Sequence, residues 1–190
     1  MTTFQMDLAD RWLVVPLDDA DAVAHWPADL EREPRYEDPD DIEHLLDAAR
    51  RMAEIPADDT LAVRLLYLPD PPFHPVFTDL HELVAEGEAD ERLPALITVE
   101  PARRGPHVSD TVELADGATA HRSVAAFPGE RSESGESGES GADAIFTAFH
   151  ALRRGGRDLV ARTAVGPDAL NLVEAVPAVE ALLSTLLVSD

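Results

Sequence analysis

Histidines and paired carboxylates are the side chains of this sequence with the clearest potential for chemistry. Seven histidines are present, and the tightest grouping with a carboxylate is His74, Asp79 and His81. A helix that presents two imidazoles to one metal ion spaces them four residues apart, and this grouping lacks that spacing. Pro75 also restricts the backbone between the two histidines. We therefore interpret His74 and His81 as surface residues and predict no metal site.

The other histidines show no catalytic arrangement. His44 lies one position from the apolar face of a predicted helix, which is typical of a boundary residue. No spacing in the sequence brings both a carboxylate and a hydroxyl to His25, His107 or His150.

Serine nucleophiles are equally hard to place. The segment 135–139 resembles a nucleophile elbow around Ser137, but Glu139 stands where the second glycine is needed. The chain contains no cysteine and no lysine, and it has neither a phosphate-binding loop nor a dinucleotide fingerprint. The acidic pairs lie at the ends of predicted elements, where capping explains them: Asp18 with Asp19, Asp40 with Asp41, Asp58 with Asp59. We predict no catalytic residues and no cofactor, although scattered catalytic groups leave a small enzyme open.

Length and composition favour a single domain over residues 1–190. The absence of cysteine removes disulfides and thiolate metal sites. The first seven residues lack the basic and apolar regions of a signal peptide, and no apolar run approaches the ~18 residues of a membrane span. We therefore expect a cytoplasmic protein that does not enter a membrane.

Charge is the most pronounced feature of the composition. The chain has 38 acidic and 15 basic residues, a net charge of −23, and every basic residue is arginine, as is common where codons are GC-rich. Nucleic-acid binding requires a basic stripe, so we predict no nucleic-acid partner. The acidity favours solubility or salt adaptation, and an acidic mimic of nucleic acid stays open as an alternative.

Alternating apolar residues and turn signals predict most of the strands. The expected strands cover 11–17, 60–68, 93–99, 108–114, 118–127, 145–152 and 158–165. Both faces of 60–68 are largely apolar, which indicates a strand covered on each side. Asp116-Gly117 and Gly155-Gly156 supply the turns of two hairpins.

Helical spacing and capping residues predict the helices. They cover 18–26, a capped segment from Pro39 to Met52, a short segment over 78–84, and two consecutive helices that start at Pro167 and Pro177. In the last of these, Val179, Leu182, Leu183 and Leu186 should face inward.

Two polar segments need separate interpretations. Residues 129–142 are rich in glycine, serine and glutamate, so we predict a long disordered loop between neighbouring strands of one sheet. Arg153, Arg154, Arg157 and Arg162 form the nearest approach to a basic patch. We interpret this patch as an exposed, solvated turn rather than a phosphate site.

The order of these elements resembles that of the PsbP-like α+β fold. The resemblance rests on the hairpin strand 116–122, the Gly155-Gly156 strand pair, the opening of the terminal helices at 165–168, their apolar run 179–186, and Phe4 with 10–12 near the start. It covers most of the chain, and residues 70–92 fit it least well. The resemblance implies an antiparallel sheet with helices packed on it.

Members of that fold are mostly non-catalytic, and the resemblance carries over no functional residue. They include accessory proteins of large assemblies, lipoproteins, and small chaperones of secreted effectors; this chain has no cysteine to lipidate. We therefore expect an adaptor, chaperone or accessory subunit that binds another protein, with a homodimer left open. A small enzyme and an acidic mimic of nucleic acid are the alternatives.

Overall fold

The computed structural model describes residues 3–9, 11–17, 25–26, 43, 46, 55–68, 76–100, 105–127, 145–165 and 169–189. The elements follow in the order β1 (Thr3–Gln5), β2 (Trp12–Val15), β3 (Leu61–Tyr67), β4 (Val76–Val84), α3 (Ala89–Leu96), β5 (His107–Glu113), β6 (Thr119–Phe127), β7 (Ile145–Arg154), β8 (Arg157–Val165), α4 (Ala169–Thr185) and β9 (Leu187–Ser189).

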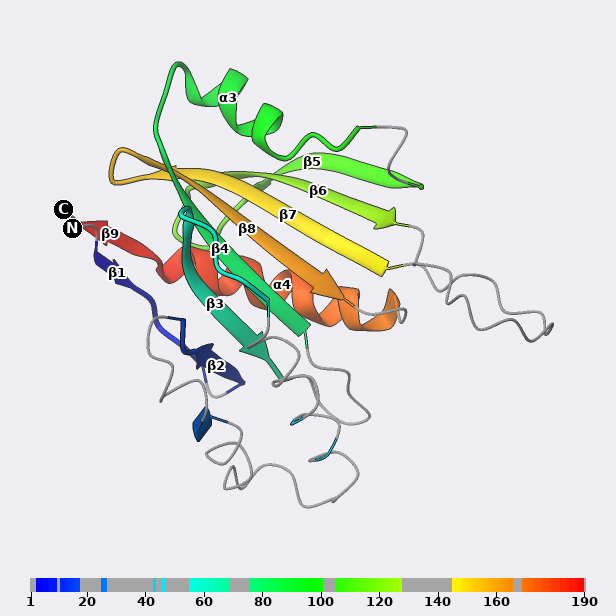
Figure 1. The fold of residues 1–190 in the computed structure, drawn as a ribbon. Helices are drawn as coiled ribbons and strands as arrows, with labels where there is room; N and C mark the ends of the chain where they lie inside the picture. The colour runs from blue at the N-terminus through cyan, green and yellow to red at the C-terminus, as the bar shows by residue number, and fades with distance from the viewer. Residues whose placement is uncertain are drawn as a thin grey trace.

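Seven of these strands form one antiparallel sheet in the order β2-β3-β4-β8-β7-β6-β5 (Figure 1). β1 and β9 pair with each other outside this sheet, with Thr3 opposite Ser189. Helices α3 and α4 pack on the seven-stranded sheet through buried apolar side chains. The predicted α+β fold, an antiparallel sheet with helices packed on it, is confirmed.

Helix α4 covers one face of the sheet with the apolar stripe that the sequence predicts. Val179, Leu182, Leu183 and Leu186 are all buried, as expected. The strand residues in the same core include Leu65, Leu80, Leu152, Leu159 and Ala161. Because side chains alternate along a strand, these residues share one face of the sheet.

The prediction of two helices that meet at Pro177 is wrong, because α4 continues through this residue. Proline lacks the N–H that would bond to the carbonyl of Val173, four residues earlier. Val173 and Pro177 are both exposed, so water can satisfy that carbonyl without breaking the helix. The predicted helical end near Val188 is instead strand β9, which pairs with β1.

The predicted strand over 93–99 is also wrong, because helix α3 occupies its first half. Leu93 and Ile97 are four residues apart and are buried together against Ala151 of β7. Since odd-numbered residues of β7 point away from α4, α3 covers the opposite face of the sheet (Figure 1). The β-branched residues near Ile97 suggested a strand, but tertiary packing favoured the helix.

The short helix predicted over 78–84 is strand β4. Val76, Thr78 and Leu80 are buried at every second position, which is the period of a strand. β4 lies between β3 and β8 and pairs with both along its length. Two neighbouring strands satisfy its backbone, which outweighs the helical spacing of Leu80, Leu83 and Val84.

β2, β3 and the two hairpins fall where the sequence predicts them. Leu65 is buried under α4, whereas Leu66 and Leu68 are buried on the other face with Trp26 and Leu46. β3 is therefore covered on both faces, as expected. Gly117, Gly155 and Gly156 have φ angles of 82°, 52° and 74°, which only glycine adopts readily in such turns.

Several predictions fall largely outside the described residues. They concern the helices over 18–26 and 39–52, of which His25, Trp26, Glu43 and Leu46 are described and helical. The segment 129–142 also lies outside the described residues. The strands on either side of it, β6 and β7, are adjacent, with Phe127 directly opposite Ile145. The strands before and after this segment are therefore neighbours in one sheet, as expected.

Candidate functional site

A groove lies between α4 and the segment that leads into β2. Its volume is about 580 Å³, within the range of pockets that hold small ligands or side chains. The residues that line it are Asp7, Ala9, Arg11, Trp12, Tyr67, Ala178, Ala181, Leu182 and Thr185. We refer to these nine residues as the α4 groove.

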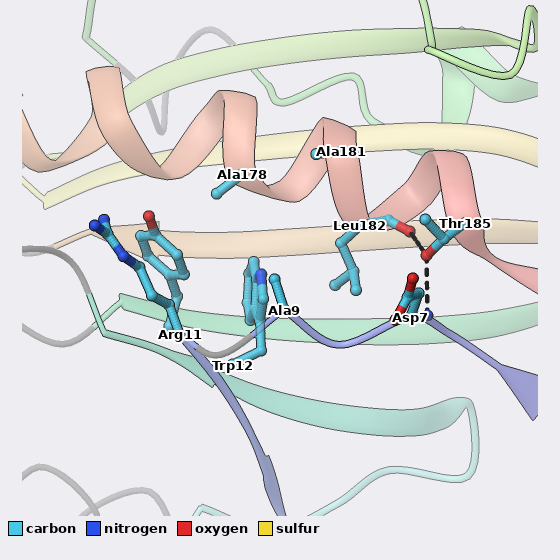
Figure 2. Close-up of a pocket in the computed structure, with 9 residues that line it drawn as sticks. Asp7, Ala9, Arg11, Trp12, Ala178, Ala181, Leu182 and Thr185 are labelled. Carbon is cyan, nitrogen blue, oxygen red and sulfur yellow. Dashed lines mark hydrogen bonds between the residues drawn. The ribbon is translucent and has the colours of Figure 1, made fainter. Parts of the chain in front are cut away.

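The groove exists because small residues face it from both sides. Ala178 and Ala181 are three positions apart on α4, and Figure 2 shows Ala178 and Leu182 directed toward the segment that carries Ala9 and Trp12. Larger side chains at the alanine positions would fill this space. Helical spacing alone predicted which side of α4 is buried, but it gave no sign of the hollow beside it.

Two aromatic residues form an apolar wall of the groove. Trp12 of β2 and Tyr67 of β3 are cross-strand neighbours, with ring centroids 4.8 Å apart and planes tilted by 46°. Both residues are buried within the sheet edge. Only 7% of the surface of Trp12 and 5% of that of Tyr67 is exposed, so the two rings present a small, rigid apolar surface to the groove.

A charged cluster stands at one end of the groove. Arg11 Nη1 donates a hydrogen bond to Glu174 Oε1 at 2.7 Å, and the Tyr67 hydroxyl donates to the same oxygen at 3.1 Å. Burial raises the pKa of the Tyr67 phenol. The phenol therefore stays protonated near neutral pH and acts as a hydrogen-bond donor.

The other end of the groove is closed by contacts between the two termini of the described chain. The backbone N–H of Asp7 donates to Thr185 Oγ1 at 3.1 Å, and this hydroxyl donates to the carbonyl of Leu182 at 2.8 Å (Figure 2). Pairing of β1 with β9 holds the N-terminal segment beside α4. The groove thus depends on contacts between residues more than 170 positions apart, which no sequence spacing reveals.

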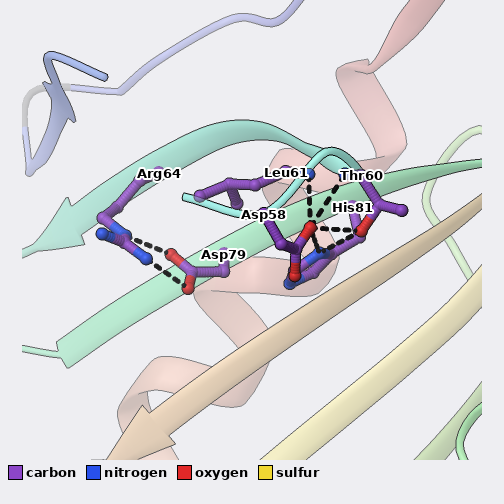
Figure 3. Close-up of polar contacts among 6 residues, drawn as sticks. All are labelled: Asp58, Thr60, Leu61, Arg64, Asp79 and His81. Carbon is purple, nitrogen blue, oxygen red and sulfur yellow. Dashed lines mark hydrogen bonds and ion pairs between the residues drawn. The ribbon is translucent and has the colours of Figure 1, made fainter. Parts of the chain in front are cut away.

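A second polar cluster lies on the opposite face of the sheet, at the start of β3 (Figure 3). The hydroxyl of Thr60 is 3.0 Å from His81 Nδ1, and Asp58 Oδ1 is 3.6 Å from the same nitrogen. Asp58 also accepts bonds from the hydroxyl and the N–H of Thr60 and from the N–H of Leu61. The Thr60 hydroxyl, followed by its backbone N–H, holds the pKa of Asp58 below its ordinary value.

This second cluster stabilises a turn and does not form a catalytic relay. In a relay the hydroxyl and the carboxylate contact different nitrogens of the imidazole, whereas Thr60 and Asp58 both approach Nδ1 of His81. The carboxylate of Asp58 accepts the N–H two residues later, as in an ordinary Asx turn.

The interpretation of His81 as a surface residue needs correction, because its side chain is only 20% exposed, and the neighbouring Asp79 is partly covered as well. The side chain of Asp79 is 16% exposed and binds the guanidinium of Arg64, which is 3% exposed, at 2.7 and 3.0 Å (Figure 3). β4 is an interior strand, so these side chains are partly covered. His74 lies outside the described residues. Among the described residues, no three His, Asp or Glu side chains are grouped so as to hold a metal ion.

A network of charges connects α4 with the far half of the sheet. Arg122 of β6 donates to both oxygens of Asp110 and, through Nη1, to Glu180 Oε1 at 2.7 Å. The fully buried His150 approaches the same Glu180 oxygen at 3.4 Å. This contact, and then the bond from Arg122, hold the pKa of Glu180 below its ordinary value. His150 thus has a carboxylate neighbour 30 positions away, which sequence spacing could not show.

Three of the four arginines in the predicted basic patch are not the exposed, solvated residues that we expected, whereas Arg162 of β8 is exposed. Arg153 donates to the buried carboxylate of Asp158, and Arg154 contacts Asp116 at 2.5 Å. Arg157 lies 3.3 Å from a carboxylate oxygen of Glu82. Each of these three side chains meets an acid supplied by another part of the fold.

Sequence comparisons identify no relatives: no protein-family model and no curated protein matches the chain. Among solved structures, the chain is similar to LpqN, a protein involved in cell envelope biogenesis of Mycobacterium tuberculosis. The TM-score is 0.47 at 10% identity, and the match covers 100% of this chain and 85% of that chain. Similarity at this level says nothing about the groove. In the described part of the chain, neither helix has the length and apolar character needed to cross a bilayer.

Proposed function

We propose that this protein is a non-catalytic binding module of PsbP-like type that holds an apolar segment of another protein in the α4 groove. The observation that carries the proposal is the shape and lining of that groove: small residues leave the space, and Trp12 and Tyr67 form a rigid apolar wall. Tyr67 and Arg11 already contact Glu174, and Thr185 already bonds to Leu182. The lining is suited to contact rather than to bond breaking.

Charge indicates the chemistry of the partner segment. The chain carries a net charge of −23, and Asp7 lines one end of the groove, whereas Glu174 at the other end is paired with Arg11. An apolar segment flanked by arginine or lysine would complement this arrangement, and long-range attraction would accelerate its association. We propose an adaptor, chaperone or accessory role in the cytoplasm for this module.

The alternative of an acidic nucleic-acid mimic receives less support. Such a mimic needs carboxylates that are free to imitate phosphates along one face. Several carboxylates of the described residues are instead engaged by arginines of the same chain, among them Asp79, Asp110, Asp116, Asp158 and Glu180. Because these carboxylates form ion pairs within the chain, they are not available to imitate phosphates.

The groove can be tested by filling it. Ala181 is exposed at the groove, so Ala181→Leu should occupy the space while keeping a good helix former. Val173→Leu is the matched control, because it adds apolar bulk to an exposed site of the same helix outside the groove lining. Both variants should keep the thermal midpoint of the original chain.

A photo-reactive amino acid at position 178, introduced in the native cell, would identify the segment that occupies the groove. A peptide of that segment is then titrated by calorimetry against the original chain, Ala181→Leu and Val173→Leu. We expect Ala181→Leu to weaken binding at least tenfold, about 1.4 kcal/mol, and Val173→Leu to leave it unchanged. Equal binding by all three proteins would refute the proposal, as would recovery of a small molecule in place of a protein segment.

A further inference from the structure

The apolar wall of the α4 groove is almost completely covered in this structure. Trp12, Tyr67 and Leu182 are all buried, although they line a hollow of about 580 Å³. The lining residues that are exposed are small or acidic: Asp7, Ala9 and Ala181. An apolar segment placed in the groove as it stands therefore contacts little of its apolar wall.

One side of the groove is formed by residues 3–9, which we call the strap. The strap begins with β1 and leads toward β2, and Figure 2 shows Ala9 beside the ring of Trp12. Its apolar side chains are partly buried against the core between α4 and the sheet: Phe4, Met6 and Leu8. Because this core includes the rings of the wall, the strap covers part of that wall.

Few interactions hold the strap in place. β1 pairs over three residues with β9, and neither strand belongs to the seven-stranded sheet. A ribbon of two strands is at best marginally stable by itself. Beyond β1, the bond from the N–H of Asp7 to Thr185 Oγ1 is the one hydrogen bond among the described residues that ties the strap to α4. Segments with so few contacts are the first to open in local unfolding.

β9, in contrast, is held by its surroundings. It follows α4 almost directly, and the β7–β8 turn approaches it so closely that a Cβ atom on Gly155 would lie 2.7 Å from the carbonyl oxygen of Val188. Arg154 of the same hairpin donates a hydrogen bond to the carbonyl of Leu183 near the end of α4. When β1 and β9 separate, β1 is therefore the strand that moves.

We propose that the strap is a clamp that opens to admit the partner segment and then closes over it. This inference rests on the proposed function of the groove. Opening of the strap at β1 uncovers the wall formed by Trp12 and Tyr67, while the pairing of β2 with β3 keeps the other end of the strap attached. Closing brings the exposed Asp7 against the basic residue that we expect beside the bound segment.

A clamp makes the apparent affinity depend on the open fraction of the molecules. When a ligand binds one conformation, its apparent dissociation constant increases as the population of that conformation decreases. A covalent lock on the closed strap therefore weakens binding even though no residue of the groove lining is changed.

The absence of native cysteine permits a reversible lock. Gln5 and Leu187 are directly opposite in the β1–β9 pair, both are exposed, and neither lines the groove. Cα atoms of paired residues in an antiparallel ladder are about 4.5 or 5.5 Å apart, which suits a disulfide. Gln5→Cys with Leu187→Cys should therefore pin the strap on oxidation. Ser109→Cys with Ser123→Cys is the matched control, because these residues are paired in β5 and β6, far from β2 in the sheet.

Calorimetry with the peptide identified by cross-linking compares the oxidised and reduced forms of both double variants. We expect the oxidised lock to bind about tenfold more weakly than its reduced form, and the control to bind equally in both forms. Equal binding by the oxidised and reduced lock refutes the clamp and leaves the groove as the binding site. Loss of binding in the original chain refutes the proposed function instead, and the next measurement then tests the clamp alone.

Quenching of Trp12 fluorescence by acrylamide reports opening without any partner. The chain has two tryptophans, and Trp26 is buried in a separate cluster on the other face of the sheet. Trp26→Phe keeps an aromatic side chain there and leaves Trp12 as the single reporter. We expect oxidation of the lock to lower the quenching rate constant about twofold, and oxidation of the control pair to leave it unchanged. Equal quenching of the locked and unlocked chains refutes the clamp.

Discussion

The ion pair between Arg64 and Asp79 permits a quantitative test of the packing on the face opposite α4. Asp79→Ala would remove the carboxylate of Asp79 from the guanidinium of Arg64, whose side chain is 3% exposed. Removing one partner of a buried pair costs about 3–5 kcal/mol, because the remaining charge stays out of water. Asp79 is itself 16% exposed, so water can approach from its side. We therefore expect the lower end, about 3 kcal/mol.

Removing both charges should cost much less than removing one. Arg64 and Asp79 stand beside apolar neighbours on the same face, including Leu66 and Phe77. In the double variant Arg64→Met with Asp79→Leu, apolar side chains replace the ion pair. The carbonyl of Ile55 loses the hydrogen bond that it accepts from Arg64, but Ile55 is exposed, so water can bind this carbonyl instead. We expect the double variant to lie within about 1 kcal/mol of the original chain.

Urea unfolding of the original chain, both single variants and the double variant measures these free energies. The slope of the free energy against urea should stay constant, so that midpoints report stability. Asp59→Ala removes an exposed carboxylate nearby and should change stability by less than about 0.5 kcal/mol. The reasoning is refuted if Asp79→Ala costs less than about 1 kcal/mol, or if the two single losses add up in the double variant.

Three further changes test other parts of the fold. Replacing residues 129–142 with a short Gly-Ser turn should leave the thermal midpoint within a few degrees, because a short turn can join the adjacent antiparallel strands β6 and β7. A fall of more than about 10 °C in calorimetry would show that the segment packs against the rest of the chain. Leu183→Ala should cost about 2–5 kcal/mol in urea unfolding, whereas Val173→Ala, at a site 73% exposed, should cost under about 0.5 kcal/mol; similar losses would contradict the orientation of α4. The contact with His150 lowers the pKa of Glu180 in the folded chain. The ionised carboxylate therefore contributes its full stability above the unfolded pKa of about 4.3, and this contribution is lost as the pH falls through the lower folded pKa. Glu180→Gln should flatten the profile of stability against pH in that acidic range, and an unchanged profile would contradict this role.

The elements that the sequence predicted correctly are those with one dominant local signal. Alternation over 60–68 and the glycines at Gly117 and Gly155-Gly156 act within a few residues, so they identify strands and turns without knowledge of the rest of the chain. The inward face of α4 was likewise predictable, because its apolar residues recur every three or four positions.

Two of the three wrong assignments, at β4 and α3, lie where local signals conflict. In β4, Leu80, Leu83 and Val84 have helical spacing, while Val76, Thr78 and Leu80 alternate as in a strand. Pairing with β3 and β8 decides between the two periods. In α3, the opposite occurs: β-branched residues near Ile97 favour a strand, and burial against Ala151 selects the helix.

The sequence by itself determined the fold class, the hairpins and the apolar stripe of the last helix, because these depend on spacing within single segments. The tertiary structure alone decided the groove, the strap that covers its wall and the partners of the arginines. These features depend on which strands become neighbours, as when Asp7 meets Thr185 or Arg122 meets Glu180. Such contacts form between distant segments as the core is buried, and each residue type involved is compatible with many other partners.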